Sequence, residues 1–158
     1  MSQPAVVEVE VRAAVPTSGG CAVFLGTEEK AFVIYIDQMV GAAIMMFMKG
    51  VPKERPQTHD LFANALTALG AKVQRVVIND SDDGVYFGRL ILQAENELSE
   101  RKIVELDARP SDCIALATEA GAPIYVVRKV WDEVEDMSEL LDKVDGLEMG
   151  EEGPNPFA

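Results

Sequence analysis

Two segments of the chain place an arginine, a proline, a hydroxyl residue and an aspartate in the same order ahead of an apolar run. They read "RPQTHDLFANAL" and "RPSDCIALATEA", and each apolar run is predicted to be a helix. An arginine just before a helix adds positive charge where the helix dipole and free backbone amides already favour an anion such as phosphate. Arg55 and Arg109 are therefore candidate substrate-binding residues. The alternative for each is an ion pair with a carboxylate such as Asp107.

The hydroxyl and acidic residues of these segments have a structural explanation beside a functional one. Thr58 and Ser111 are predicted to be N-caps, each accepting a hydrogen bond from a free backbone amide. Asp60 and Asp112 would lie in the first helical turn, where the helix dipole favours negative charge. Capping alone would account for all four residues, so contact of Thr58 and Ser111 with a substrate is one of two open alternatives.

His59 is the single histidine of the chain, so any imidazole chemistry must use it. Its place beside the predicted cap keeps the ring near the start of the helix. We expect it to act as a general acid or base, or to orient a water molecule. The alternative is a surface histidine without a catalytic role.

Carboxylates could supply a site for a hard cation such as Mg²⁺ or Mn²⁺, which prefers oxygen ligands. The segment "NDSDDG" concentrates three of them, and Asp80, at the end of a predicted strand, is its best metal candidate. Asp82 and Asp83 are explained by a tight hairpin turn. We expect Asp80, Asp107 and Asp112 to hold the metal, with Asp60 as a further catalytic carboxylate.

The elements that must position these residues follow from hydrophobic patterning. The chain begins with a predicted three-stranded meander ending at Asp37, which caps a helix over 38–49 that stops at Gly50. The remaining predicted elements are a helix from Thr58 to Leu69, strands over 71–80, 85–95 and 101–108, a helix over 111–120 and a strand over 123–130. Residues 1–135 form one predicted domain, and 136–158 an acidic C-terminal tail with at most one short helix.

The two Arg-Pro segments share a longer plan. Each runs from a predicted cap through an apolar helix to Gly-Ala, at residues 70–71 and 121–122, and then into a strand. This similarity suggests two related α–β units packed in one sheet. If so, we expect Arg55 and Arg109 to open onto a shared cleft with Asp107 nearby.

Composition limits the classes of function. The chain has 158 residues, 48 % of them hydrophobic, which suits one globular domain. Its formal net charge of −13 disfavours unaided binding to polyanions such as nucleic acids.

The apolar run 39–48 is about half as long as a membrane span, and no targeting signal opens the chain, so we expect a cytoplasmic protein that does not enter the membrane. Cys21 and Cys113 lack metal or redox spacing and are expected to be buried.

Three stretches of the sequence resemble the bifunctional nuclease domain family. They are "VIYIDQMVGAAI", "RPQTHDLFANALTALGAKVQRVVINDSDDGVYFGRLIL" and "DARPSDCIALATEAGAPIYVVRKV", and the similarity spans about residues 5–135. The resemblance implies an α+β fold with a mixed, largely antiparallel sheet and two or three packed helices, and a tendency to dimerise. For plant members it implies nuclease activity on RNA and DNA. Val40 stands where family members generally carry a glutamate. If that carboxylate serves a metal site in the family, this chain lacks it, unless Asp37 substitutes for it.

From these observations we expect a nuclease of low sequence specificity that acts on RNA, DNA or both with Mg²⁺ or Mn²⁺. The alternative is a non-catalytic dimeric binding or regulatory module. The helix over 38–49 is too apolar for one sheet face to cover, so we expect it, or a strand beside it, to form a two-fold homodimer contact outside the acidic tail. The alternative is a helix buried within the monomer.

Overall fold

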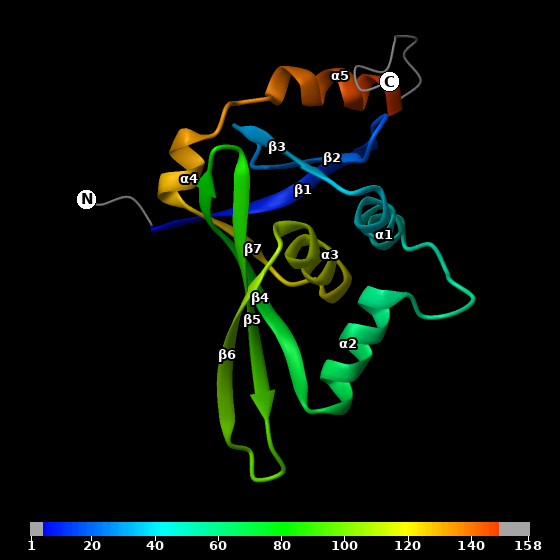
Figure 1. The fold of residues 1–158 in the computed structure, drawn as a ribbon, viewed down its shortest axis with the longest axis vertical. Coiled ribbons are helices and arrows are strands. Elements are labelled where there is room, and N and C mark those ends of the chain that lie inside the picture. The colour runs from blue at the N-terminus through cyan, green and yellow to red at the C-terminus, as the bar shows by residue number, and fades with distance from the viewer. Residues whose placement is uncertain (1–4, 149–158) are drawn as a thin grey trace.

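The fold, described for residues 5–148 in a computed structural model, is built on one seven-stranded sheet (Figure 1). In chain order its strands are β1 (Val6–Pro16), β2 (Cys21–Gly26), β3 (Ala31–Ile36), β4 (Ala71–Asp82), β5 (Val85–Glu95), β6 (Arg101–Ala108) and β7 (Ile124–Val127). They lie in the order β3-β2-β1-β7-β4-β5-β6, and every neighbouring pair is antiparallel except β4 and β7. The α+β fold with a mixed, largely antiparallel sheet is confirmed.

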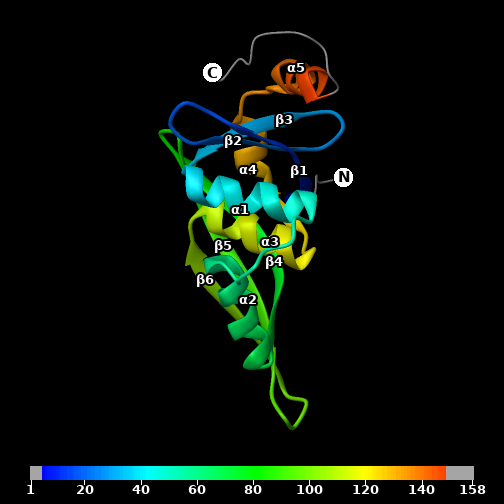
Figure 2. The same ribbon diagram turned by 90° about the vertical axis from the view of Figure 1, so that its right-hand side faces the viewer.

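Helices cover both faces of this sheet. They are α1 (Gln38–Lys49), α2 (Thr58–Ala68), α3 (Pro110–Ala120), α4 (Arg128–Glu133) and α5 (Ser138–Glu148). The first three are the helices expected from the sequence, and Figure 2 shows α1, α3 and α2 in a row along one side of the molecule. Helix α4, of six residues, and helix α5, of eleven, add to them, and only α5 lies in the predicted tail. No helix within residues 5–148 combines the length and apolar character that crossing a membrane requires.

The two α–β units lie side by side as predicted. Strand β4 follows α2, strand β7 follows α3, and the two strands are parallel neighbours in which Val76 pairs with Ile124. The hairpin between β4 and β5 also forms as expected. Asp83 and Gly84 have φ values of 49° and 81°, the pair of positive angles that a tight two-residue hairpin turn requires.

The ends of the helices correct part of the sequence prediction. Asp37 caps α1 as expected, accepting from the Val40 amide at 3.0 Å. The N-caps of α2 and α3 are Gln57 and Arg109, however, so the predicted caps Thr58 and Ser111 were wrong. Proline suits the first helical position, and Pro110 therefore starts α3 one residue early and leaves Ser111 buried inside the first turn.

The last strand is shorter than predicted. It ends at Val127 rather than at residue 130, because Val127 pairs with Val6 at the start of β1 and no described strand continues beside it. The chain turns there into α4, which buries Val130 and Trp131.

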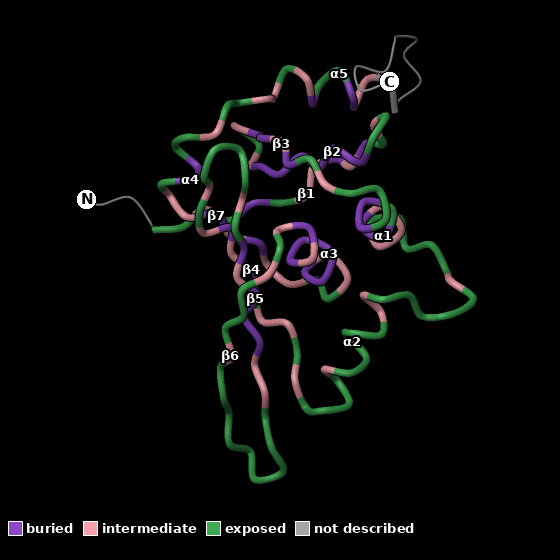
Figure 3. Tube along the Cα trace, viewed as in Figure 1, coloured by how far each residue is buried: buried purple, intermediate pink, exposed green. Residues whose placement is uncertain are grey.

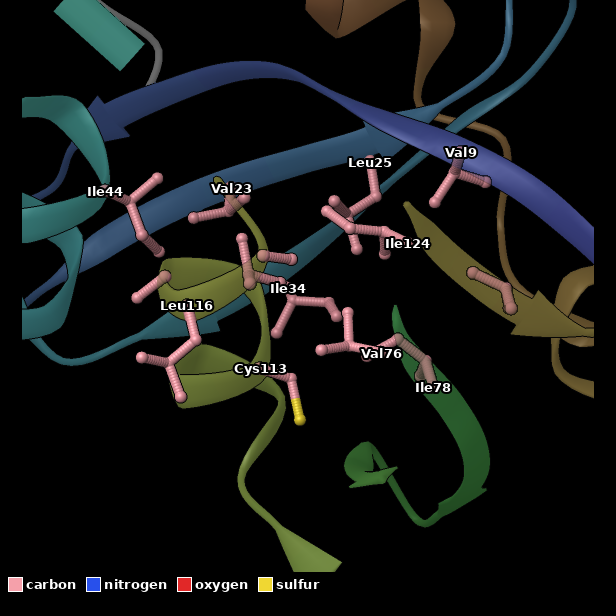
Figure 4. Packing of buried hydrophobic residues seen from close by; sticks show 14 of the residues in the cluster. Val9, Val23, Leu25, Ile34, Ile44, Val76, Ile78, Cys113, Leu116 and Ile124 are labelled. Atoms are coloured by element: carbon pink, nitrogen blue, oxygen red, sulfur yellow. The ribbon is translucent and has the colours of Figure 1, made fainter. Parts of the chain in front are cut away.

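Two apolar clusters hold the layers together. The larger lies between the sheet and helices α1 and α3, and Figure 4 shows Val23, Ile44, Val76 and Cys113 among its members. Both cysteines are buried and free, as expected. The smaller cluster lies on the opposite face of β1 and β2, where Leu141 and Val144 of α5 are buried. The predicted tail thus contributes a packed helix, and its residues 149–158 lie outside the described part.

Burial is uneven along the molecule. Helix α2 has no buried residue, and Figure 3 shows it and the adjoining ends of β4, β5 and β6 in the colours of partial and full exposure. Helix α1 buries one face against β2 and α3. A Cβ atom on its Gly41 would lie 2.4 Å from the Cβ of Cys21, so the helix lies directly on the sheet there. Its Met39 remains 84 % exposed.

Candidate functional site

A pocket of about 470 Å³ lies where α2, α3 and strand β6 meet. We call it the α2–α3 pocket. Its polar wall consists of five of the residues singled out from the sequence: Thr58, His59, Asp107, Arg109 and Asp112. Its apolar wall includes Phe62, Leu90, Leu106 and Leu116. The fold therefore brings the two Arg-Pro segments together, as their shared plan suggested.

Asp112 is the centre of the polar wall. Its Oδ1 lies 2.9 Å from His59 Nε2, and its Oδ2 accepts a 2.8 Å hydrogen bond from Arg109 Nε. Burial opposes ionisation of this carboxyl group, but the hydrogen bonds from Arg109 and His59 outweigh burial and hold the pKa of Asp112 below its usual value. Asp112 is therefore an anion that holds both Arg109 and His59 in place.

Arg109 continues this chain toward α1. Its Nη1 lies 3.6 Å from Asp37 Oδ2, while its side chain remains 65 % exposed. The hydrogen bonds to Asp112, followed by its charge and that of Asp37, raise the pKa of Arg109 above its already high value. Arg109 therefore forms the ion pair that we gave as its alternative role, but its partners are Asp112 and Asp37 rather than Asp107.

His59 is held by Asp112 with its ring mostly buried, at 14 % exposure. In the neutral tautomer that donates from Nε2 to Asp112, Nδ1 carries the lone pair that can accept a proton. A carboxylate that orients an imidazole in this way also stabilises the charged ring once it has taken up a proton. The pair can therefore serve as a general base and then as a general acid.

Asp107 reaches the pocket from β6, where its backbone pairs with that of Arg89. Within residues 5–148 its side chain takes part in no hydrogen bond or ion pair. It is therefore the one carboxylate of the pocket that no protein cation neutralises. Beneath it, burial, followed by the charges of Asp112 and Asp107, raises the pKa of Cys113 to about 12, so this thiol stays protonated and is a poor nucleophile.

A second polar group lies near His59, and of its three members only Asp60 was singled out from the sequence. We call Lys53, Asp60 and Glu119 the Lys53 cluster. Lys53 Nζ lies 2.8 Å from both carboxylate oxygens of Asp60, and these bonds, helped by the Gln57 amide, lower the pKa of Asp60 although burial opposes the change. Asp60 is thus engaged in holding the start of α2 and does not line the α2–α3 pocket.

Glu119 completes the Lys53 cluster from α3. Its Oε2 is fully buried without a hydrogen-bond partner, and burial, followed by the charge of Asp60, raises its pKa. The signal that could have indicated Glu119 is a lone acid within the apolar helix "CIALATEA". Lys53 has no comparable signal, because it lies in the connector, seven positions before Asp60.

Three other candidates lie away from the pocket. Asp80 is exposed at the end of β4, and its Oδ1 accepts from the Ser81 amide at 2.8 Å. Arg55 is exposed, forms no ion pair with the described residues, and does not line the pocket. Ser111 is buried and faces a different pocket on the other side of Arg109. The shared cleft that we expected for the two arginines therefore contains only Arg109.

The expected metal ligands do not form one site in this arrangement. Among residues 5–148, no three or more His, Cys, Asp or Glu side chains are grouped as a metal ion would require. Asp112 already shares its oxygens with Arg109 and His59, and Asp80 bonds to its own turn. Asp107 alone would be insufficient, so the donor set does not fit a resident divalent ion.

Comparisons with known proteins show the family to which the chain belongs. The chain is similar to two proteins of Mycobacterium tuberculosis, the uncharacterized protein MT1877 of strain CDC 1551 / Oshkosh and the uncharacterized protein Rv1829 of strain H37Rv. Each is 33 % identical over 132 residues, a match covering 70 % of this chain and 76 % of the relative. The sequence profile of the bifunctional nuclease domain matches residues 23–139, which include all the pocket residues. This chain therefore belongs to the bifunctional nuclease domain family.

Proposed function

We propose that this domain hydrolyses phosphodiester bonds of RNA, DNA or both, with low sequence specificity, in the α2–α3 pocket. The observation that carries the proposal is the His59–Asp112–Arg109 chain, which lines one pocket together with the unneutralised Asp107. Membership of the bifunctional nuclease domain family supports nucleic acid as the substrate class.

Arg109 is proposed to bind the scissile phosphate. A guanidinium group has five N–H donors, and Asp112 takes only those on Nε and Nη2 that face it. The exposed remainder of the group is available to phosphate oxygens and would stabilise the charge that develops on them. Asp112 holds the guanidinium in place and so limits the entropy lost on binding.

His59 is proposed to transfer the proton. As a general base it would take a proton from the attacking water. The leaving oxygen departs on the opposite side of the phosphorus and would take its proton from solvent, to which the imidazolium then returns its own. Asp112 stabilises that imidazolium through the Nε2 contact. Asp107 is proposed to orient the water, since its oxygens have no other partner among the described residues.

The requirement for Mg²⁺ or Mn²⁺ expected from the sequence rests on Asp80, Asp107 and Asp112, which do not form a site here. No step above passes through a metal ion. An assay with EDTA, and with added Mn²⁺, tests the requirement directly.

The deciding experiment is hydrolysis of labelled RNA and DNA by highly purified protein. His59→Gln and the double variant Asp107→Asn/Asp112→Asn should each lower the rate by about 100-fold or more, the typical share of general acid–base catalysis. Asp142→Asn, an exposed aspartate on α5, is the matched control and should leave the rate unchanged. Equal rates for wild type and all variants would identify the activity as contamination and refute the assignment.

One observation favours the alternative of a non-catalytic binding or regulatory module. Arg109 and Asp112 satisfy each other, as do Lys53 and Asp60, which is the arrangement expected if the Arg-Pro segments serve architecture alone. In that case the assay above would show no activity that depends on His59, with or without metal.

The homodimer and the cytoplasmic location expected from the sequence remain proposals. The homodimer has support from apolar side chains left on the surface of α1, where Met39 and Met48 are exposed. Sedimentation at micromolar concentration separates a monomer of 17.2 kDa from a dimer.

A further inference from the structure

A second pocket, of about 450 Å³, adjoins the α2–α3 pocket across Arg109. It lies between strand β3, the turn joining β4 and β5, and the first residues of α3, and we call it the β3 pocket. The residues that matter here are Tyr35, Asp37, Val85, Tyr86, Arg109 and Ser111. Both pockets fall within the range of about 300–1,000 Å³ that small-molecule sites occupy.

Arg109 forms the wall that the two pockets share. On one side its Nε bonds to Asp112, and on the other its Nη1 lies 3.6 Å from Asp37. A phosphate bound to this guanidinium would therefore have one pocket on each side of it. Along a nucleic acid strand, a nucleoside lies on each side of every phosphate.

The walls of the β3 pocket suit a flat, partly polar group. Tyr35 is 66 % exposed on strand β3, and Val85 is 59 % exposed at the turn. Tyr86 is fixed by a ring contact with Phe32 at 5.9 Å between centroids. Such aromatic and aliphatic surfaces stack on any nucleobase, because every base has a π-face. The Ser111 hydroxyl and the Asp37 carboxylate add polar groups at the edge.

We propose that the β3 pocket binds the base of the nucleotide next to the scissile phosphate, which makes single-stranded nucleic acid the substrate class. This inference rests on the function proposed above for the neighbouring pocket. A base inside the β3 pocket cannot remain paired, so a duplex would first have to unstack and unpair it, which costs free energy and weakens binding.

The charge of the molecule also supports binding through a base rather than through the phosphates. A net charge of −13, with Asp37 and Asp112 beside the only arginine of the site, provides little attraction for a polyanion. Affinity must then come mainly from contact with a base. With one phosphate contact, the logarithm of the binding constant should fall with the logarithm of the salt concentration with a slope of about −0.7, far shallower than for a basic groove.

Binding of a short fluorescent oligonucleotide, measured by anisotropy, tests the inference. Val85→Trp would fill the β3 pocket and should weaken single-strand binding about tenfold, the scale of one lost base stack. The matched control is Phe87→Trp, two residues along β5, which lines neither pocket and should bind as wild type does. The duplex of the same sequence should bind the wild-type protein at least about tenfold more weakly.

Tyr35→Ala provides a second variant that removes a wall instead of filling the space, and it should also weaken binding. If thermal unfolding shows that Val85→Trp is misfolded, the binding affinity of Tyr35→Ala tests the β3 pocket in its place. Equal affinities for the β3-pocket variants and the control, or for duplex and single strand, would overturn the inference.

Cleavage of the same oligonucleotide by wild type and His59→Gln keeps the two proposals apart. If cleavage depends on His59 but Val85→Trp does not change binding, the proposal for the β3 pocket is overturned and the nuclease proposal stands. If Val85→Trp weakens binding but no cleavage depends on His59, the proposal for the β3 pocket stands and the hydrolytic function is refuted.

Discussion

Replacing Glu119 by glutamine should stabilise the protein at neutral pH. The carboxyl group of Glu119 lies in the Lys53 cluster beside Asp60, with Oε2 fully buried and without a partner. Ionising it there places a second negative charge next to Asp60 and leaves a buried acceptor unsatisfied. A glutamine side chain keeps the size, removes the charge, and can donate an N–H to the Asp60 carboxylate.

The expected gain follows from the environment of Glu119. An unsatisfied buried polar group costs about 1–3 kcal/mol. Lys53, which already neutralises Asp60, offsets part of the repulsion, so we expect a gain near the lower end, about 1 kcal/mol. For a chain of this length, that corresponds to a rise in melting temperature of roughly 2–4 °C.

The pH dependence provides the sharper test, and its sign follows from the raised pKa of Glu119. Burial and Asp60 make the folded protein bind this proton more tightly than the unfolded chain does, so the wild type loses stability as the pH rises from the usual value of 4.5 through the raised pKa. Near and below pH 4.5 the protonated carboxyl group resembles the amide, and the difference between wild type and Glu119→Gln should vanish.

Urea unfolding of both proteins across this pH range measures the difference. Glu133→Gln, an exposed glutamate at the end of α4, serves as the control and should show no such trend. A destabilised Glu119→Gln at neutral pH, or a gain that does not change with pH, would refute the account of the Lys53 cluster.

Three further predictions address other parts of the molecule. Arg109→Ala should raise the KM for nucleic acid and also destabilise α3 by up to about 1 kcal/mol, the value of an exposed ion pair, whereas Arg55→Ala should change neither in the same assays. Gly88→Ala should lower the free energy of unfolding, measured in urea, by about 1–3 kcal/mol, because the new Cβ would lie 2.9 Å from Cys113 Sγ. As the control, Gly19→Ala should be tolerated, because its Cβ would meet no atom within 4 Å. Met39→Glu should convert the proposed homodimer to monomers in sedimentation, and a dimer that survives it would show that the contact lies elsewhere.

Local sequence signals predicted those helix ends and turns that depend only on residues near them in the sequence. The helix over 38–49 has both its cap and its stop in the sequence, and Asp83-Gly84 specifies its turn by backbone conformation alone. The strand ending at Val127 was predicted too long, because its end depends on where a distant partner strand begins.

The candidate site was predictable only in part, for a similar reason. The repeated Arg-Pro plan indicated that the two segments would meet, and Thr58 and Arg109 do line one pocket, but Arg55, which we expected beside Arg109, does not. The choice of Asp112 rather than Asp107 as the partner of Arg109 depends on side-chain directions that spacing does not specify. The Lys53 cluster joins a connector, α2 and α3, and only the packed fold brings these together.

The position of β7 has a consequence for synthesis of the protein. This strand lies between β1 and β4, so it joins a half-sheet made from residues 6–36 to one made from residues 71–108. A nascent chain cannot close this seam until residue 127 has left the ribosome, although both halves can already have formed. Until then β1 and β4 each present unpaired backbone groups to other chains. Translation that stalls or terminates before β7 should therefore yield an aggregation-prone fragment, because β7 covers the two strand edges from which another chain could extend the sheet.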